Sequence, residues 1–145
     1  MRKERRMIMN TKTYTTLPQE AKDIRIEVFM KEQGFENEFD EIDTISHHIV
    51  VFDEGKPIGT CRFFKENDHY TIGRVAVLKA YRNQHIGNLL LSAEKEIINL
   101  NGDLIVVHAQ VRVSPFYTKQ GYIQFGQIDD NEGVPHMWMK KRIQH

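Results

Sequence analysis

The sequence predicts a single α/β domain, with a mixed central sheet of about seven strands and helices on both faces of that sheet. Short apolar segments in the first half are separated only by tight turns, which is typical of an antiparallel meander. A strand, a long amphipathic helix and an all-apolar strand then follow in that order, which is typical of a parallel pair joined by a crossover. No repeat, low-complexity tract or linker divides the 145 residues, and that length is typical of one domain.

The first half of the chain is expected to hold one helix and four strands. Ala21, Ile24 and Val28 recur at helical spacing, and Gly34 suits the left-handed end of that helix. The segment Asp53–Lys56 is typical of a hairpin turn between two strands. The expected elements are a strand over 11–16, a helix over 19–33, an irregular acidic stretch over 35–46, and strands over 47–53, 57–65 and 69–78.

The second half is expected to begin with a long helix. Leu89, Ala93 and Ile97 lie on one helical face. The all-apolar run Leu104–Val107 is typical of a strand that is covered on both faces. The expected elements are a helix through Leu100, a strand over 104–107, a short helix opened by Ser114 and closed by Gly121, and strands over 122–128 and 137–142.

The charge balance limits the classes of partner. Lysine and arginine number 20, as do aspartate and glutamate, so the formal net charge of zero argues against nucleic acid and membrane surfaces as partners. Residues 1–10 are expected to be a flexible basic N-terminal segment, with a weak nucleic-acid arm as the alternative, and residues 11–145 a single domain. The one cysteine, Cys61, excludes an intrachain disulfide and fits a reducing compartment, so we expect the cytoplasm.

A candidate anion site follows the strand that contains Val75 and Val77. The chain turns tightly there and opens the long helix, whose first turn has unpaired backbone N–H groups and the positive end of the helix dipole. Arg82 adds a full charge, and Gly87 lets a ligand approach the backbone. These features favour a phosphate or pyrophosphate site, and the alternative is an ordinary turn between a strand and a helix.

The segment Tyr81–Gly87 resembles the acyl-CoA pyrophosphate loop of the GNAT N-acetyltransferases. That loop reads Arg or Gln, two variable residues, Gly, one variable residue, then Gly or Ala. Arg82 and Gly87 match, whereas His85 stands in place of the first glycine. The resemblance implies an acetyl-CoA site formed by Val75, Val77, Arg82, Asn83, Gln84, His85, Ile86, Gly87, Asn88 and Gln110.

A second match begins at Gln110, where the family often has asparagine seven residues before a tyrosine. Here that tyrosine is Tyr117, and the resemblance implies that it protonates the departing coenzyme A thiolate. A phenol with a pKa near 10 is a suitable acid for this step. The alternative is a packing tyrosine on a short helix. The resemblance also implies a β-bulge near Val75 and Val77, which would free a backbone donor for the thioester oxygen.

Two further segments, Glu32–Gly34 with its acidic continuation and Val134–Met137, resemble a small bacterial subgroup of the family, the ElaA- and YjcF-like proteins. The resemblance extends from about residue 12 to 143. It implies the GNAT acyl-CoA N-acyltransferase fold and acetyl transfer to a primary amine by direct attack in a ternary complex. The alternative is a non-catalytic module that binds or senses acyl-CoA on the same fold.

The acceptor is expected to be a small-molecule or peptide amine. Glu38 and Asp40 are the predicted acceptor-binding residues, because a negative loop attracts a cationic amine, and a solvated acidic loop is the alternative. The general base stays open among His47, His48, His108, Glu38 and His136. No metal is expected, since one cysteine and two adjacent histidines lack the spacing of a metal site. A homodimer is one open alternative for the assembly.

Overall fold

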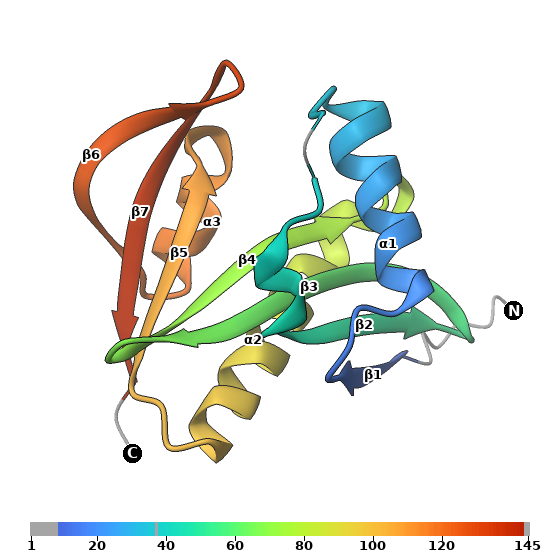
Figure 1. The fold of residues 1–145 in the computed structure, drawn as a ribbon, viewed down its shortest axis with the longest axis horizontal. Coiled ribbons are helices and arrows are strands. Elements are labelled where there is room, and N and C mark those ends of the chain that lie inside the picture. Colours follow the sequence, from blue (N-terminus) through green and yellow to red (C-terminus); the bar gives the residue numbers. More distant parts are fainter. Residues whose placement is uncertain (1–8, 37, 144–145) are drawn as a thin grey trace, which may run out of the picture.

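The computed structural model describes residues 9–36 and 38–143 (Figure 1). Its strands form one seven-stranded sheet in the order β1-β2-β3-β4-β5-β7-β6. The strands are β1 (Met9–Tyr14), β2 (His47–Asp53), β3 (Lys56–Glu66), β4 (His69–Val77), β5 (Leu104–Gln110), β6 (Ile123–Asn131) and β7 (Val134–Arg142). The helices are α1 (Gln19–Arg25), the π-helix η1 (Ile26–Glu32), α2 (Arg82–Asn99), α3 (Ser114–Lys119) and the 3-10 turns η2 (Glu41–Thr44), η3 (Lys79–Tyr81) and η4 (Val111–Val113).

The sheet confirms the predicted fold class. Strands β2, β3 and β4 form the expected antiparallel meander. Strand β4 pairs in parallel with β5, and α2 is the crossover that connects them. Strand β7 lies between β5 and β6, antiparallel to both, and the sequence pattern did not indicate this order. The first strand begins at Met9 and ends at Tyr14, two residues earlier at each end than expected. The predictions for residues 1–8 lie outside the described residues.

Helices cover both faces of the sheet, and each face has its own core. On one face α2 contributes Leu89, Leu90 and Ile97 to a core that the sheet completes. On the other face Ala21 and Ile24 of α1 pack in a second core. Figure 1 shows α1 in front of the central strands and α2 behind and below them. Because both faces are covered, nearly the whole of β2 is buried, as is expected for an interior strand.

The first helix changes its winding after about two turns. The predicted helix over 19–33 is an α-helix only to Arg25, and Ile26–Glu32 continues it as a π-helix. A π-helical turn takes an additional residue, so it rotates the following side chains relative to an α-helix of the same length. The prediction failed here because the spacing of apolar residues cannot distinguish these windings. Gly34 then ends the helix with φ 80°, as expected.

Two tight connections, the β2–β3 hairpin and the turn after α2, depend on glycine. Glu54 and Gly55 both have positive φ, which gives the hairpin between β2 and β3 the left-handed turn that suits twisted strands. Gly102 follows α2, and a Cβ there would lie 2.5 Å from Ile97 and 2.7 Å from Tyr70. A glycine is therefore required for α2 to end against β4. No helix among the described residues has the length and hydropathy needed to cross a membrane.

Candidate active site

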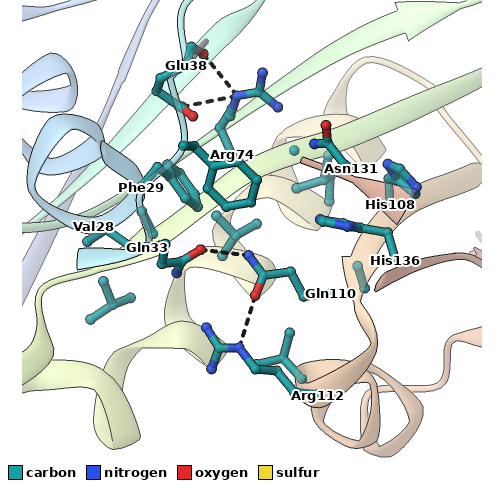
Figure 2. Close-up of a pocket in the computed structure, with 18 of the residues that line it drawn as sticks. Val28, Phe29, Gln33, Glu38, Arg74, His108, Gln110, Arg112, Asn131 and His136 are labelled. Carbon is teal, nitrogen blue, oxygen red and sulfur yellow. Dashed lines mark hydrogen bonds and ion pairs between the residues drawn. The ribbon is translucent and has the colours of Figure 1, made fainter. Parts of the chain in front are cut away.

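The parallel pair β4–β5 separates after only three residue pairs. Tyr70, Thr71 and Ile72 pair with Ile105, Val106 and Val107, and no pairing continues beyond them. Both strands run on past this point, β4 to Val77 and β5 to Gln110. A pocket lies at the split, between the end of β4, the end of β5, η1 and the start of β7 (Figure 2).

A β-bulge forms the β4 side of the split. Thr60 of β3 pairs with Ala76, whereas Arg62 pairs with Gly73, so β4 carries one extra residue between these positions. Within this segment Arg74 has φ 51°, a left-handed conformation that is uncommon for a residue with a side chain. A bulge interrupts the ladder and leaves backbone groups without a partner in the sheet. The expected bulge is therefore present, and Val75 within it lines the pocket.

The start of α2 lies at the end of the same strand. Arg82 is the first residue of the helix and lines the pocket. Its Nη1 and Nη2 donate to the Glu32 carboxylate at 2.7 and 2.8 Å, and its Nε and Nη2 donate to the Val77 carbonyl. The hydrogen bond with Arg82 lowers the pKa of Glu32 below its ordinary value. The predicted pyrophosphate-binding arginine is thus held between η1 and β4.

The remaining residues of the predicted loop lie within α2. The side chains of Asn83, Gln84, His85 and Ile86 lie outside the described part of the structure, but their backbone is α-helical. His85 therefore has a right-handed backbone, and its N–H points toward the N-terminus of the helix together with the other N–H groups of the first turn. Apart from its own helix backbone, a Cβ added at Gly87 would meet none of the described residues within 4 Å. Asn88 is exposed and donates to the Met9 sulfur at 3.7 Å, and it does not line the pocket.

Gln110 and Tyr117 form part of the opposite side. Gln110 Nε2 donates to Gln33 Oε1 at 2.8 Å, and Arg112 Nε donates to Gln110 Oε1 at 3.0 Å (Figure 2). Tyr117 lies in α3 with 6% of its surface exposed and lines the pocket. Burial, together with the neighbouring Cys61, raises the pKa of Tyr117 above its ordinary value. The phenol is therefore protonated at neutral pH and can act as a proton donor.

The acidic stretch forms an ion-pair cluster with three arginines, and four of its six members are buried. The members of this arginine cluster are Arg25, Arg62, Arg74, Glu38, Asp40 and Asp43. Arg25 lies at its centre, with Nε 2.8 Å from Glu38 Oε1 and Nη1 2.8 Å from Asp43 Oδ1. Arg62 Nη1 bridges Asp40 at 2.6 Å and Asp43 at 2.9 Å. The carboxylates are thus matched by an equal number of guanidinium groups.

Of the two predicted acceptor-binding residues, only Glu38 lines the pocket. Its Oε1 lies 3.0 Å from Arg74 Nε, and this pair faces the pocket from above in Figure 2. Burial raises the pKa of Glu38, against the opposing charges of Arg74 and Arg25. Asp40 binds Arg62 and Arg74 and is not among the pocket residues.

Sequence reasoning did not identify the arginine cluster. The signal that could have found it is a charged residue at a core position: Arg25 follows the buried Ile24, and Arg62 lies between the buried Cys61 and Phe63. A buried arginine needs carboxylate partners, and the chain has a run of them just after the first helix. The open alternative of a solvated acidic loop is therefore wrong for Glu38 and Asp43, which are 4% and 6% exposed.

The histidines fall into two groups. His48 is buried with Nε2 2.9 Å from the Asp43 carbonyl, and His47 stacks on Phe63 with ring centroids 4.8 Å apart. Neither lines the pocket, whereas His108 and His136 both do. Figure 2 shows these two rings side by side on the wall opposite the Glu38–Arg74 pair.

Cys61, the metal-ligating side chains and Trp138 do not form a further reactive site among the described residues. Cys61 is buried, and burial raises the pKa of its thiol to about 12, so it is a packing residue rather than a nucleophile. No group of three or more metal-ligating side chains occurs among the described residues. Trp138 stacks on His108 of the neighbouring strand with ring centroids 4.3 Å apart, so it packs on the sheet.

Comparisons with known proteins agree with this architecture. The family described as an acetyltransferase (GNAT) domain matches residues 14–143. The chain is 35% identical to the uncharacterised N-acetyltransferase YjcF of Bacillus subtilis over 122 residues, 81% of this chain and 87% of that protein. Escherichia coli ElaA has a crystal structure with a TM-score of 0.79 at 23% identity, covering 94% of this chain and 100% of that one. An acyl-CoA N-acyltransferase from Pseudomonas aeruginosa has a TM-score of 0.80 at 22% identity, over 94% and 99% of the two chains, and at these identities both structures show a shared fold.

Proposed function

The chain belongs to the GNAT acetyltransferase family, in the ElaA- and YjcF-like subgroup, and from that premise we propose that it transfers an acetyl group from acetyl-CoA to a primary amine. Membership of the family supports acyl transfer from acyl-CoA in general. The acetyl group, the amine and the direct attack in a ternary complex are our proposal. The observation that carries it is the split between β4 and β5 beside a bulge, with the N-terminus of α2 at the same end of the strand.

The described residues fit acyl-CoA at this split. The open space beside Gly87 at the first turns of α2 suits a pyrophosphate, which needs close approach to backbone N–H groups. We propose that Arg82 and the backbone of the loop from Asn83 to Asn88 hold the pyrophosphate. Val75 and Val77 would hold the pantetheine arm along β4, and Gln110 would hold it from β5.

Acetyl-CoA, when bound, supplies a thioester activated for attack. A backbone N–H freed by the bulge at Arg74 and Val75 would donate to the carbonyl oxygen and stabilise the charge that develops there. Tyr117 would donate its phenolic proton to the departing thiolate. Glu38 and Arg74 face the pocket from the β4 side, so we propose that they contact the acceptor, with Asp40 acting through Arg74.

Acetyl-CoA binding followed by thiol release tests the proposal. Calorimetry should show saturable binding, and a panel of small-molecule and peptide amines should then release coenzyme A thiol with at least one acceptor. Binding without release on any amine would support the alternative of a non-catalytic module. Absence of binding would contradict the site.

Gly87→Val provides a test of the cofactor loop itself. The branched side chain has room among the described residues, because beyond the backbone of its own helix none of them lies within 4 Å of its Cβ, but it would occupy the space assigned to the pyrophosphate. We expect acetyl-CoA binding to be abolished while the fold is retained. Leu91→Val, at a position of α2 that is 56% exposed, introduces the same β-branched residue into the same helix and should bind normally.

A further inference from the structure

Two histidines lie on one wall of the pocket because of the register between β5 and β7. Residue His136 of β7 pairs with Gln110, and Trp138 pairs with His108, so these four side chains share one face of the sheet. His108 is also the first residue of β5 after the pairing with β4 ends. The register therefore brings both imidazoles to the edge of the split, opposite the bulge.

A backbone carbonyl determines the tautomer of His136. Its Nδ1 lies 2.8 Å from the Val134 oxygen, and a carbonyl can only accept, so Nδ1 carries the hydrogen. The lone pair of the neutral ring is then on Nε2, which makes no hydrogen bond with the described residues. His136 lines the pocket, and Figure 2 shows its ring projecting between Asn131 and Gln110. A proton acceptor is thus directed into the cavity.

The surroundings keep His136 neutral. It is 6% exposed, and this burial lowers the pKa of His136 below its ordinary value. The Val134 hydrogen bond opposes that effect, as do Asp129 and Asp130 of β6, whereas His108 of β5 reinforces it. On the far side of the pocket, the charges of Glu38 and Arg74 are paired with each other.

His108 is fixed in a different way. Its Nε2 lies 2.8 Å from Asp129 Oδ1, and its ring is stacked on Trp138 and lies 4.8 Å from the ring of His136. Since a carboxylate accepts, Nε2 of His108 is a donor and is already used. His108 therefore supports the neighbouring ring of His136, and Asp129 in turn orients His108.

We propose that Nε2 of His136 is the base that takes a proton from the acceptor, with His108 as a positioning residue; this rests on the proposed acetyl transfer to an amine. The acceptor ammonium gives one proton to Nε2, which frees the nitrogen lone pair. That lone pair forms the C–N bond, the C–S bond breaks, and its electrons go to sulfur. Tyr117 gives its proton to the thiolate and recovers one from the attached amine. The products are one amide, one thiol and one proton, which His136 releases to solvent.

Nitrogen-15 NMR of the free protein tests the tautomer without any acetyl-CoA. The imidazole shifts of His136 should show Nδ1–H and an unprotonated Nε2 at neutral pH, with a pKa below the usual value of about 6.5. Most neutral histidines carry the hydrogen on Nε2, so this result is specific. A neutral His136 with its hydrogen on Nε2, or a ring charged at pH 7, would overturn the proposal.

The pH dependence of kcat/KM tests the role of the base. With an amine that the wild-type protein acetylates, His136→Gln should lower kcat/KM by about 10²–10⁴-fold and remove the rise with pH that the imidazole causes. His108→Gln should have a smaller effect and keep that rise, shifted in pH. His69→Gln, on the β3–β4 hairpin outside the pocket, is the matched control and should change neither.

The outcomes separate the two proposals. If His136→Gln keeps the wild-type pH profile, or if only His108→Gln loses it, His136 is not the base, although amine acetylation stands. If the wild-type protein acetylates no amine, the proposed function fails and the role of His136 fails with it. Unchanged acetyl-CoA affinity verifies that His136→Gln folds, and His136→Asn is the second variant if it does not.

Discussion

The two sides of the pocket differ in how their polar groups are used. On the β4 side, the charged groups of the arginine cluster have partners of opposite charge within 2.6–3.3 Å. On the side formed by β5, β7 and α3, His136 and Tyr117 line the pocket, and neither Nε2 of His136 nor the hydroxyl of Tyr117 has a hydrogen bond to the described residues. A polar group that is fully paired holds the shape of the protein, whereas one directed into a cavity is available for chemistry.

Because of this difference, variants on the β4 side should mainly lower the free energy of unfolding, and variants on the other side should mainly lower the turnover rate. Removing one partner of a buried ion pair leaves a charge without compensation, so variants of the arginine cluster should unfold more easily. Removing a group that has no partner in the free protein has little effect on folding. Variants on the His136 and Tyr117 side should therefore fold normally and react slowly.

The largest expected effect is on the arginine cluster. Arg25 is 1% exposed and contacts Glu38 and Asp43, so Arg25→Met should lower the free energy of unfolding by about 3–5 kcal/mol. Urea unfolding measures this change. Arg142→Met, which removes an exposed pair with Asp103 at 3.5 Å, should cost no more than about 1 kcal/mol. Similar values for both variants would show that burial of the cluster is not what stabilises it.

Tyr117→Phe should lower the turnover rate and leave the stability unchanged. Turnover should fall by roughly ten- to a thousandfold, with acetyl-CoA affinity and unfolding free energy close to wild type, because only a hydroxyl without a protein partner is lost. The matched variant is Tyr122→Phe, which removes a buried hydroxyl that donates to Glu94 at 2.7 Å. It should lower stability and leave the turnover of folded protein unchanged. Wild-type turnover in Tyr117→Phe would make Tyr117 a packing residue.

Acid should weaken the arginine cluster through Asp43. Burial alone would raise the pKa of Asp43, but its hydrogen bonds and charge interactions with Arg25 and Arg62 outweigh burial and lower it to about 2, from an ordinary value of 3.8. A carboxyl whose pKa is lowered by folding stabilises the protein above its unfolded pKa and loses that effect as pH falls through the folded pKa. We therefore expect a loss of about 2 kcal/mol between pH 4 and pH 2. Urea unfolding over this range should show a shallower dependence in Asp43→Asn.

The smallest expected effect concerns Arg82, which is bound to Glu32 in the free protein. Glu32→Gln removes the charge that competes for the guanidinium, so acetyl-CoA should bind more tightly. A partly exposed ion pair contributes about 0.2–1 kcal/mol, which corresponds to at most about a fivefold lower Kd by calorimetry. Glu27→Gln, which removes only an exposed pair with Lys31, should leave the Kd unchanged. Weaker binding by Glu32→Gln would mean that Glu32 positions Arg82 for the ligand.

The helices and strands were predictable from the sequence because each one depends on the spacing of residues within its own segment. Alternation, helical spacing and turn residues identified most of the elements within two residues of their observed ends, and Gly34 ended the first helix as expected. The position of β7 between β5 and β6 was not predictable in this way, because pairing between distant strands has no local pattern. The π-helical winding of Ile26–Glu32 was missed for the related reason that apolar spacing is similar in both kinds of helix.

The site was predictable in its outline and not in its contacts. The strand-to-helix loop could be proposed from its pattern and Tyr117 from the family resemblance, and the fold brings Arg82 of that loop and Tyr117 to the pocket. Glu38 pairs with Arg25 and Arg74, and Asp40 pairs with Arg62 and Arg74, all outside the acidic stretch, so charge counting over a short window described an acidic loop where the folded protein has a neutral cluster. Only the folded register distinguishes His136 from the other histidines.

The short parallel ladder between β4 and β5 has a mechanical consequence. Three residue pairs join a four-stranded half, β1 to β4, to a three-stranded half made of β5, β7 and β6, while longer ladders hold each half together. The sheet should bend most easily at this short ladder. A ligand bound in the split would contact both halves and restrain that motion. Amide hydrogen exchange at Ile72 and Val107 should therefore slow when the split is filled, and it would report binding of any ligand there, whether or not the ligand reacts.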